Sequence, residues 1–289
     1  MKKYAIYPGI EVLETNECTK LLPALAAPPQ ATQNILEINY CHKGRMERRM
    51  ADGCLQYLGE GDLFLNTGYN QSKTAGLPLG YYQGITIIID LVTAAAGLPA
   101  LLPGLSVNLI QMAGRLFEQD DCLFLSARKS IDTIFHSIYT IPDEAKVSLL
   151  RLKVLELILY LHYLDIDAER CRKTYTRPQV DLIKQVHDQI VSNPGCRFTI
   201  DELSRRFCIS PTTLKTNFKG VYGTSIMTYI RQYRIKHAAT LLRESGKSIA
   251  EIAEEVGYES QSKFGAAFKE IMKCSPMEYR QKSSAPKQE

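Results

Sequence analysis

The C-terminal part of the chain contains an internal repeat, in which the pattern of residues 199–229 returns over residues 248–279. The matched positions keep a constant offset up to a short turn, where the second copy gains one residue. Before the turn Ile200, Leu203 and Phe207 match Ile249, Ile252 and Val256, and after it Leu214, Phe218, Lys219, Ser225 and Tyr229 match Phe264, Phe268, Lys269, Ser275 and Tyr279. Apolar residues three and four positions apart lie on one face of a helix. Each copy is therefore expected to form a helix, a tight turn and a second helix.

Both copies carry sequence signals for the starts of these helices. In the first copy Thr199 and Glu202 have the spacing of a capping box, and Ser210 followed by Pro211 is typical of an N-cap and a first helical residue. The second copy repeats the capping box, adds a turn glycine and ends in another N-cap: Ser248, Glu251, Gly257 and Ser260.

A helix-turn-helix motif places its second helix in the major groove of DNA, and two motifs in one chain can read two successive grooves. We expect the outward residues of the second helices to contact bases: Thr212, Lys215, Thr216, Gln261, Ser262 and Lys263. We expect phosphate contacts from Ser210, Lys219, Arg231 and Lys269. A helical bundle with solvated basic faces is the alternative for one unit, but two units with matched caps and lysines favour DNA binding.

A long helix is expected between the copies, from Ser225 to about Arg243. At about 1.5 Å rise per residue it spans nearly 30 Å, which is close to the DNA turn of about 34 Å that separates successive grooves. This helix could hold both recognition helices on one side of a duplex.

Several ordered motifs in this region match a known family: residues 209–214 (Ile-Ser-Pro-Thr-Thr-Leu), 229–242 with Arg234, Ala238 and paired leucines, 248–253, Gly257-Tyr258, Phe268-Lys269 and 275–280. On these motifs, residues from about 177 to 282 resemble the two-motif DNA-binding domain of the AraC/XylS family of bacterial regulators. The resemblance implies binding in the major groove by both motifs. It also implies control of nearby promoters, most often as an activator, with RNA polymerase as a further partner.

Three positions depart from the family pattern. Cys208 stands in the first turn where a glycine is usual, which is unfavourable if that residue needs a positive φ. Ile226 replaces the proline that usually follows Ser225. Ala266 stands where relatives often have an arginine, so a bidentate reader of guanine is missing, and Gly265 lowers the helix propensity beside it. The second motif is therefore expected to position the protein more than it specifies the sequence.

Length and charge fit two domains. The chain has 289 residues, enough for about two domains. Residues 177–289 hold 18 Lys and Arg against 12 Asp and Glu, a net charge of +6, whereas the remainder holds 17 against 19, a net charge of −2. Positive charge thus lies in the segment expected to bind phosphates, although +6 could also serve solubility. We expect a sensing and dimerisation domain over 1–168, a linker over 169–178, the DNA-binding domain over 179–282 and a flexible tail over 283–289.

The eight cysteines are scattered, without a CxxC pair or a zinc-finger spacing. Neither a metal nor a cofactor is expected, and a redox switch is the alternative to reduced, buried thiols. No signal peptide is recognised, because the apolar stretch after Lys3 is short and contains Pro8 and Glu11. The apolar run 91–110 is interrupted by glycines and prolines, so it is expected to be a short helix and a buried loop. These features favour a bacterial cytoplasmic protein.

Residues 33–90 have the texture of short strands and turns, such as Asp52-Gly53, which predicts a β-sandwich or barrel. The turn Gly61-Asp62-Leu63 resembles the cupin-like barrel that AraC-type regulators use as a sensor. A metal-dependent cupin enzyme would carry a His-x-His pair and a later histidine, and this region offers only His42.

A barrel of this size can hold one small ligand. We expect an unidentified small-molecule effector to contact Tyr40, Arg45, Tyr57, Tyr81 and Tyr82. A sugar, an aromatic acid, a siderophore or a nucleotide signal would all be compatible. For each of these residues a place in the core or at a solvated edge is an equal alternative.

Two helices are expected after the barrel, over residues 123–139 and 141–164. The second is apolar on two faces, so it must be covered on more than one side. The resembled family commonly dimerises through a helix here, and the expected homodimer contacts are Leu150, Val154, Leu157, Ile158 and Leu161. Burial within a single chain is the alternative.

The sequence thus predicts an α+β protein of two domains, an N-terminal cupin-like β-barrel with flanking helices and an all-α domain with two helix-turn-helix motifs. The predicted function is ligand-controlled, sequence-specific DNA binding without catalysis. One alternative is a regulator whose N-terminal domain only dimerises or binds a protein. The remote alternative is a cupin enzyme with an accessory helical domain.

Overall fold

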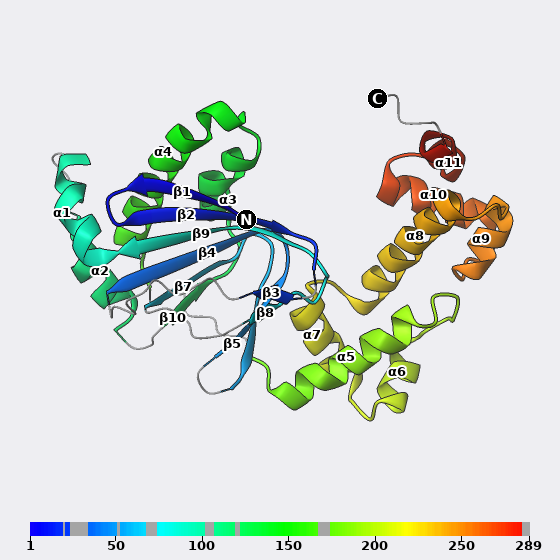
Figure 1. Ribbon diagram of the computed structural model, residues 1–289. Coiled ribbons are helices and arrows are strands. Elements are labelled where there is room, and N and C mark those ends of the chain that lie inside the picture. The colour runs from blue at the N-terminus through cyan, green and yellow to red at the C-terminus, as the bar shows by residue number, and fades with distance from the viewer. Residues whose placement is uncertain are drawn as a thin grey trace. The chain divides into compact units, whose positions relative to one another are not determined.

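The computed structural model describes residues 1–19, 21–23, 34–50, 53–67, 74–101, 107–118, 122–166 and 174–284. The chain divides into two compact units, Met1–Tyr175 and Thr176–Glu289 (Figure 1). The first half of the expected linker, 169–173, lies outside the described residues. The second half of the linker has regular structure. Tyr175 forms a β-bridge with Leu55, and the first helix of the second unit begins at Arg177.

The N-terminal unit contains two antiparallel sheets. The larger one has the order β1 (Lys2–Tyr7), β2 (Ile10–Glu17), β9 (Tyr82–Asp90), β4 (Ile35–Gly44), β7 (Leu63–Thr67) and β10 (Cys122–Leu125). The smaller one has the order β3 (Leu21–Pro23), β8 (Thr74–Gly76), β5 (Met46–Arg49) and β6 (Leu55–Leu58). The expected cupin-like barrel is not confirmed, because the described strands form two sheets with free edges and do not close into a barrel.

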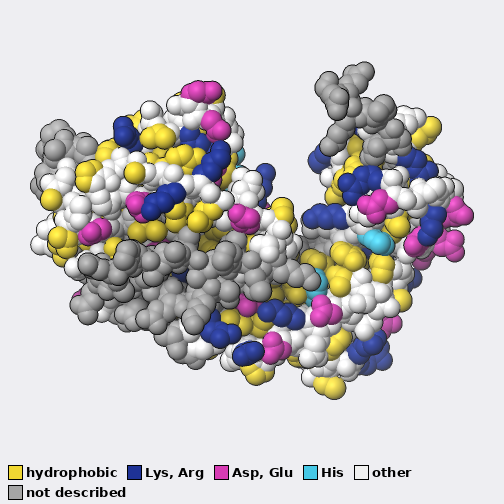
Figure 2. Space-filling model, viewed as in Figure 1, with side chains coloured by type: hydrophobic (Ala, Val, Ile, Leu, Met, Phe, Trp, Pro, Cys, Tyr) yellow, Lys and Arg dark blue, Asp and Glu magenta, His cyan; other side chains and the backbone are white. Residues whose placement is uncertain are grey.

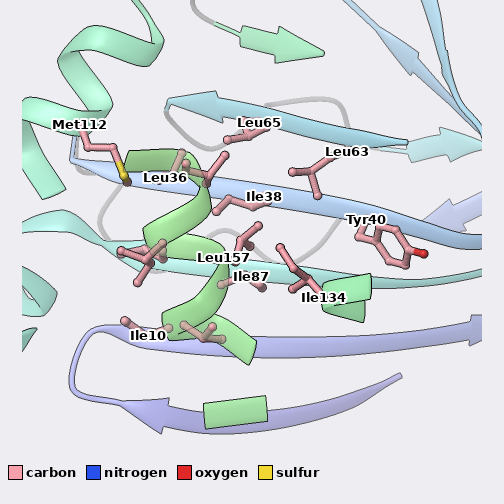
Figure 3. Close-up of a cluster of buried hydrophobic side chains, with 14 of the residues drawn as sticks. Ile10, Leu36, Ile38, Tyr40, Leu63, Leu65, Ile87, Met112, Ile134 and Leu157 are labelled. Atoms are coloured by element: carbon pink, nitrogen blue, oxygen red, sulfur yellow. The ribbon is translucent and has the colours of Figure 1, made fainter. Parts of the chain in front are cut away.

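Four helices accompany the larger sheet: α1 (Leu91–Leu101), α2 (Leu109–Leu116), α3 (Lys129–His136) and α4 (Asp143–His162). Their apolar residues form one core with one face of this sheet, and Figure 3 shows Met112, Ile134 and Leu157 packed over the sheet. The prediction of a helix over 123–139 is wrong for the first residues of this range, since α3 begins only at Lys129. Residues Cys122–Leu125 instead form β10, which pairs with β7 at the edge of the sheet.

The two faces of the central strand β4 differ in chemistry. Leu36, Ile38 and Tyr40 belong to the core beneath the helices. Because successive side chains of a strand point to opposite faces, Glu37 and Asn39 lie on the other face, and both are buried. The larger sheet therefore has an apolar face toward the helices and a partly polar buried face.

Helix α4 belongs to the core of its own chain. Leu150, Val154, Leu157, Ile158 and Leu161, the residues expected at a dimer interface, are at most 2% exposed. A second copy could not reach these residues without opening the core. The helix is fixed at its start by a buried ion pair between Lys146 Nζ and Glu14 Oε1 (2.9 Å). At its end Arg115 donates to the carbonyl oxygens of Leu161, His162 and Leu164.

The C-terminal unit consists of α5 (Arg177–Val191), α6 (Ile200–Arg206), α7 (Pro211–Tyr222), α8 (Ile226–Glu244), α9 (Ile249–Glu255), α10 (Gln261–Met272) and α11 (Pro276–Ser284). The repeat is confirmed as two helix-turn-helix motifs, α6–α7 and α9–α10, joined by α8. Both expected capping boxes are present, Thr199 with Glu202 and Ser248 with Glu251. Each motif has its own apolar core, and that of the second is centred on Phe264 and Phe268, both fully buried.

Within the described residues, no helix is both long enough and apolar enough to cross a lipid bilayer. The run 91–110 contains α1 and the start of α2, while its middle, 102–106, lies outside the described part. The same described residues hold no group of three or more His, Cys, Asp or Glu side chains placed to bind a metal ion.

Candidate nucleic-acid interface

Helix α7 presents the first set of predicted contacts. Ser210 caps it, since its Oγ accepts a hydrogen bond from the backbone N–H of Thr213 (3.2 Å). Leu214 and Phe218 are fully buried, which fixes the rotation of the helix about its axis. The predicted contacts on the other side of the helix are all exposed: Thr212, Lys215, Thr216 and Lys219. The Ser210 hydroxyl is used in the cap, so a phosphate contact at this position would rely on backbone N–H groups of the first turn.

Helix α10 presents the second set in the same way. Ser260 Oγ accepts from the backbone N–H of Lys263 (3.3 Å), and the buried Phe264 and Phe268 fix the exposed face. The predicted contacts on α10 are all exposed: Gln261, Ser262, Lys263 and Lys269. Ala266 is exposed on the same helix, so this face carries a methyl group at a position where a longer side chain could reach a base.

Glu259 forms two ion pairs that the sequence did not predict, one of them with Lys263. Nζ of Lys263 lies 3.4 Å from Glu259 Oε2, and the other oxygen of Glu259 lies 3.5 Å from Nη1 of Arg197. All three side chains are exposed, so these pairs contribute little to stability. They place one carboxylate and two cations near the start of α10, where DNA would approach.

Arg231 makes contacts other than those predicted. Its guanidinium forms a two-pronged ion pair with Glu270, which lies on α10. This pair raises the pKa of Arg231 and lowers that of Glu270. A phosphate contact by Arg231 would require the pair to open, and the arrangement ties α8 to the second recognition helix.

Arg234 connects the two motifs. From α8 it donates hydrogen bonds to the carbonyl oxygens of Pro194 (2.9 Å) and Cys196 (2.7 Å) before α6, and of Gly257 (3.2 Å) after α9. The backbones also meet directly, because a Cβ built on Gly257 would lie 2.7 Å from the carbonyl oxygen of Gly195. One arginine thus fixes the loop before α6 and the turn after α9 to the connecting helix, which links the start of the first motif to the turn of the second.

The turns of the two motifs each contain a residue with a positive φ at the same position of the repeat. Gly257 has a φ of 80° and Cys208, at the matching position, has a φ of 51°. The expected strain at Cys208 is therefore confirmed, since residues with a Cβ rarely adopt this region.

Charge is distributed evenly over the visible side of the C-terminal unit. Basic and acidic side chains are interspersed there (Figure 2).

The structure does not bring the five predicted effector contacts together. Tyr40 faces the helices, where it stacks on Phe135 (4.1 Å between ring centroids) and donates to Asp132. Tyr82 is buried on the other side of the sheet and donates to the carbonyl oxygen of Tyr40 (3.4 Å). Arg45 and Tyr57 also meet, with the guanidinium carbon 5.6 Å from the ring centroid. Tyr81 is half-buried, and an effector contact at any of the five remains a prediction.

Comparison with known proteins agrees with the double helix-turn-helix. A family model described as "Helix-turn-helix domain" matches residues 203–282. A "Putative AraC-like transcription regulator" from Streptomyces lividans is 34% identical over 94 residues, covering 32% of this chain and 31% of the relative. The "HTH-type transcriptional regulator AlkR" from Acinetobacter baylyi is 35% identical over 90 residues, covering 31% and 29%. The "HTH-type transcriptional activator RhaR" from Yersinia pestis is 30% identical over 140 residues, covering 48% and 47%.

The C-terminal unit therefore belongs to the class of double helix-turn-helix domains. It is a domain of the AraC type, as its motifs had led us to expect. These relatives are regulators rather than enzymes, in agreement with the expected lack of catalysis. The match spans about a third to a half of the length of these relatives.

Comparison with solved structures also found similar chains. The C-terminal domain of AraT, a response regulator from Geobacillus stearothermophilus, is 28% identical, covers 37% of this chain and 90% of its own, and has a TM-score of 0.35. Fatty-acid-bound ToxT from Vibrio cholerae covers 96% of both chains at 14% identity and a TM-score of 0.33.

Proposed function

We propose that the protein is a sequence-specific, DNA-binding transcriptional regulator in which α7 and α10 enter successive major grooves. The observation that supports this most is the pair of capped helices α7 and α10. In each of them two buried aromatic or aliphatic residues fix the rotation of the helix, so that lysines and other polar side chains lie outward. The AraC type of the domain supports the same function.

Base readout and phosphate contact are assigned to different lysines. Lys215 lies in the second turn of α7, among threonines that can also reach base edges. Lys219 and Lys269 lie in the last turns of α7 and α10, where contacts to the DNA backbone are the simpler expectation. The second motif, with Ala266 and Gly265 in its helix, contributes more to position than to sequence preference.

The test compares two lysine variants of the full chain on its preferred DNA. Lys215→Ala should relax the preference at one or two base pairs, each worth about 1–3 kcal/mol. Lys269→Ala should weaken all sequences alike and reduce the salt dependence by about one charge. Equal loss of sequence preference in both variants, measured by binding to a set of single-base-pair variants, would contradict this division.

Activation through RNA polymerase and a location in a bacterial cytoplasm remain part of this proposal. Activation is supported by the name of one relative, a transcriptional activator. In vitro transcription from a bound promoter, with and without the protein, distinguishes activation from repression.

The N-terminal unit is proposed to bind a small-molecule effector that changes DNA affinity. Coupling of this kind is usually worth about 1–3 kcal/mol and is reciprocal, so DNA should raise effector affinity by the same factor. The alternative is a unit that only dimerises or binds a protein. A thermal-shift screen of the full chain against metabolites separates the two, since the alternative predicts that no metabolite shifts unfolding.

Homodimerisation is also retained as a proposal, but on a different face of α4. The outward side of this helix carries the exposed Leu152 (65%) and the half-buried Leu155 and Leu159. These residues recur at the spacing of a helical stripe. They are available to a second copy, whereas the five buried residues are not.

A further inference from the structure

Six polar side chains are buried between the two sheets of the N-terminal unit, and we call them the inter-sheet polar cluster: Glu37, Asn39, Arg48, Gln56, Asn66 and Thr86. Five of them are at most 6% exposed, and the side chain of Arg48 is 10% exposed. They come from both sheets, from β4, β7 and β9 on one side and β5 and β6 on the other. Lys, Glu, Arg, Asn and Gln are mostly surface residues, so such a group between sheets requires an explanation.

Four of the six side chains form hydrogen bonds with one another. Thr86 Oγ1 donates to Asn39 Oδ1 (2.8 Å), and Asn39 Nδ2 donates to Glu37 Oε1 (2.6 Å). Both terminal nitrogens of Arg48 lie 3.5 Å from the same Glu37 oxygen, so the pair joins the two sheets. The guanidinium carbon also lies 4.3 Å from the ring centroid of Phe64. The positive and the negative charge offset each other, and the cluster is neutral overall.

Within the described part of the chain, several of the remaining polar atoms have no hydrogen-bond partner. Gln56 Nε2 and Oε1, Asn66 Oδ1 and Arg48 Nε are buried without a hydrogen bond. Gln56 is directly opposite Arg48 in the β5–β6 register, and Asn66 is directly opposite Glu37 in the β4–β7 register. The contact between Arg48 and Glu37 therefore brings these two residue pairs next to one another. Side chains directly opposite on paired strands lie on the same face, about 5 Å apart. Buried polar groups are nearly always hydrogen-bonded, so this arrangement is suited to a partner that enters from outside.

The chemistry of the cluster restricts that partner. A charged ligand would add an uncompensated charge beside the neutral Glu37–Arg48 pair, which burial disfavours. Gln56 offers a donor and an acceptor, Asn66 an acceptor and Arg48 a donor. A hydroxyl group both donates and accepts, so neighbouring hydroxyls on one molecule can serve all of these groups together.

We propose that the inter-sheet polar cluster binds an uncharged small molecule that carries several hydroxyl groups. This proposal rests on the proposed function, because it assigns the chemical class and the contacts of the effector. The site differs from the five predicted contacts. Of those, only Tyr82 lies in the apolar cluster beside it, with Cys41, Met46, Leu58, Phe64 and Leu77.

The experiment measures thermal unfolding of the full chain with a matched panel at about 10 mM: neutral sugars and polyols, the corresponding sugar acids and amino sugars, and aliphatic and aromatic acids. At least one neutral polyhydroxyl compound should raise the unfolding temperature by about 2 °C or more. Charged counterparts of that compound should have no effect. No shift from any neutral member, or a shift from charged or apolar members alone, overturns the proposal.

Variants then place the effect in the cluster. Gln56→Met and Asn66→Leu remove unpartnered polar atoms with little change in volume, so each should fold and lose the ligand-induced shift. Asn217 provides a matched control, because it is also a buried amide with an unpartnered atom but lies on α7 in the other unit. Asn217→Leu should keep the full shift. A shift retained in both cluster variants, or lost in Asn217→Leu, contradicts the assignment.

DNA binding by the same preparations separates this inference from the proposed function. A chain that binds specific DNA but responds to no neutral polyhydroxyl compound refutes the inter-sheet site and leaves the regulator intact. A ligand shift that depends on Gln56 and Asn66 in a chain without any sequence-specific DNA binding refutes the regulator and leaves the site.

Discussion

At the scale of single residues, backbone conformation and one arginine account for much of the geometry of the DNA-binding unit. Cys208 and Gly257 occupy the same left-handed position in the two turns, but only Gly257 does so without a Cβ. Arg234 uses three backbone carbonyl oxygens to hold the loop before α6 and the turn after α9 against α8. Sequence reasoning found Cys208 because the resembled family usually has a glycine at this position. It could not assign the role of Arg234, since its partners are backbone atoms, which leave no pattern in the side chains.

Cys208→Gly should stabilise the C-terminal unit. A residue with a Cβ in the left-handed region is unfavourable by roughly 1–2 kcal/mol, and the added freedom of glycine in the unfolded chain returns part of this. We expect a net gain of about 0.5–1 kcal/mol, measured by calorimetry of the full chain as a higher unfolding temperature for this unit.

The reciprocal variant is the control. Gly257→Ala should destabilise the unit by more than about 1 kcal/mol, because its Cβ would lie 2.7 Å from the Gly195 carbonyl oxygen and 2.8 Å from Nη2 of Arg234. If both substitutions shift stability in the same direction, the account of the two turns is wrong.

At the scale of helices and strands, local sequence signals determine which elements could be predicted. Capping boxes, N1 prolines and matched apolar positions are local signals, and every helix of the two motifs begins where they predict. The strands β1 and β2 were missed, although Pro8-Gly9 followed by the alternation after Ile10 is a hairpin signal. Strand β10 was mistaken for helix because a four-residue apolar run has no distinguishing period.

The capping boxes make helix α6 sensitive to acid. Hydrogen bonds from the hydroxyl and the backbone N–H of Thr199 lower the pKa of Glu202. A lowered pKa in the folded state stabilises the fold above the unfolded value of about 4.3, and this stabilisation is lost as pH falls through the folded pKa. Thr199→Val should move the pKa of Glu202 toward its ordinary value, as measured by NMR titration, and should reduce the acid dependence of unfolding. An unchanged pKa would show that the hydroxyl is not its main cause.

The two faces of α4 make opposite predictions. Leu157→Ala removes a side chain that is 1% exposed and should destabilise the N-terminal unit by about 2–5 kcal/mol. Leu152→Ala, at 65% exposure, should change stability by less than about 0.5 kcal/mol. If the chain dimerises through this face, sedimentation should show Leu152→Glu weakening the dimer while the subunits stay folded. A wild-type chain that is monomeric at micromolar concentration, with and without DNA, removes the dimer proposal.

At the scale of the whole molecule, the chain joins two units, and the sequence predicted the C-terminal one better than the N-terminal one. Both helix-turn-helix motifs could be predicted because each is built from contiguous residues with a repeated pattern. The division of the N-terminal unit into two sheets could not, because pairing such as that between β2 and β9 joins residues about 70 positions apart. The inter-sheet polar cluster is hidden in the sequence for the same reason. Its members are single polar residues on five strands, and only the register brings them together.

The most direct test of the central claim is selection of the full chain on random double-stranded DNA, followed by sequencing of the bound fraction. Two recognition helices held at a fixed distance by α8 and Arg234 should enrich two blocks of conserved bases with centres about 10–10.5 base pairs apart. The block that loses information in Lys215→Ala should be the more sharply defined of the two. Enrichment of a single block, of two blocks at variable spacing, or of no sequence at all would contradict the account of two motifs reading successive grooves.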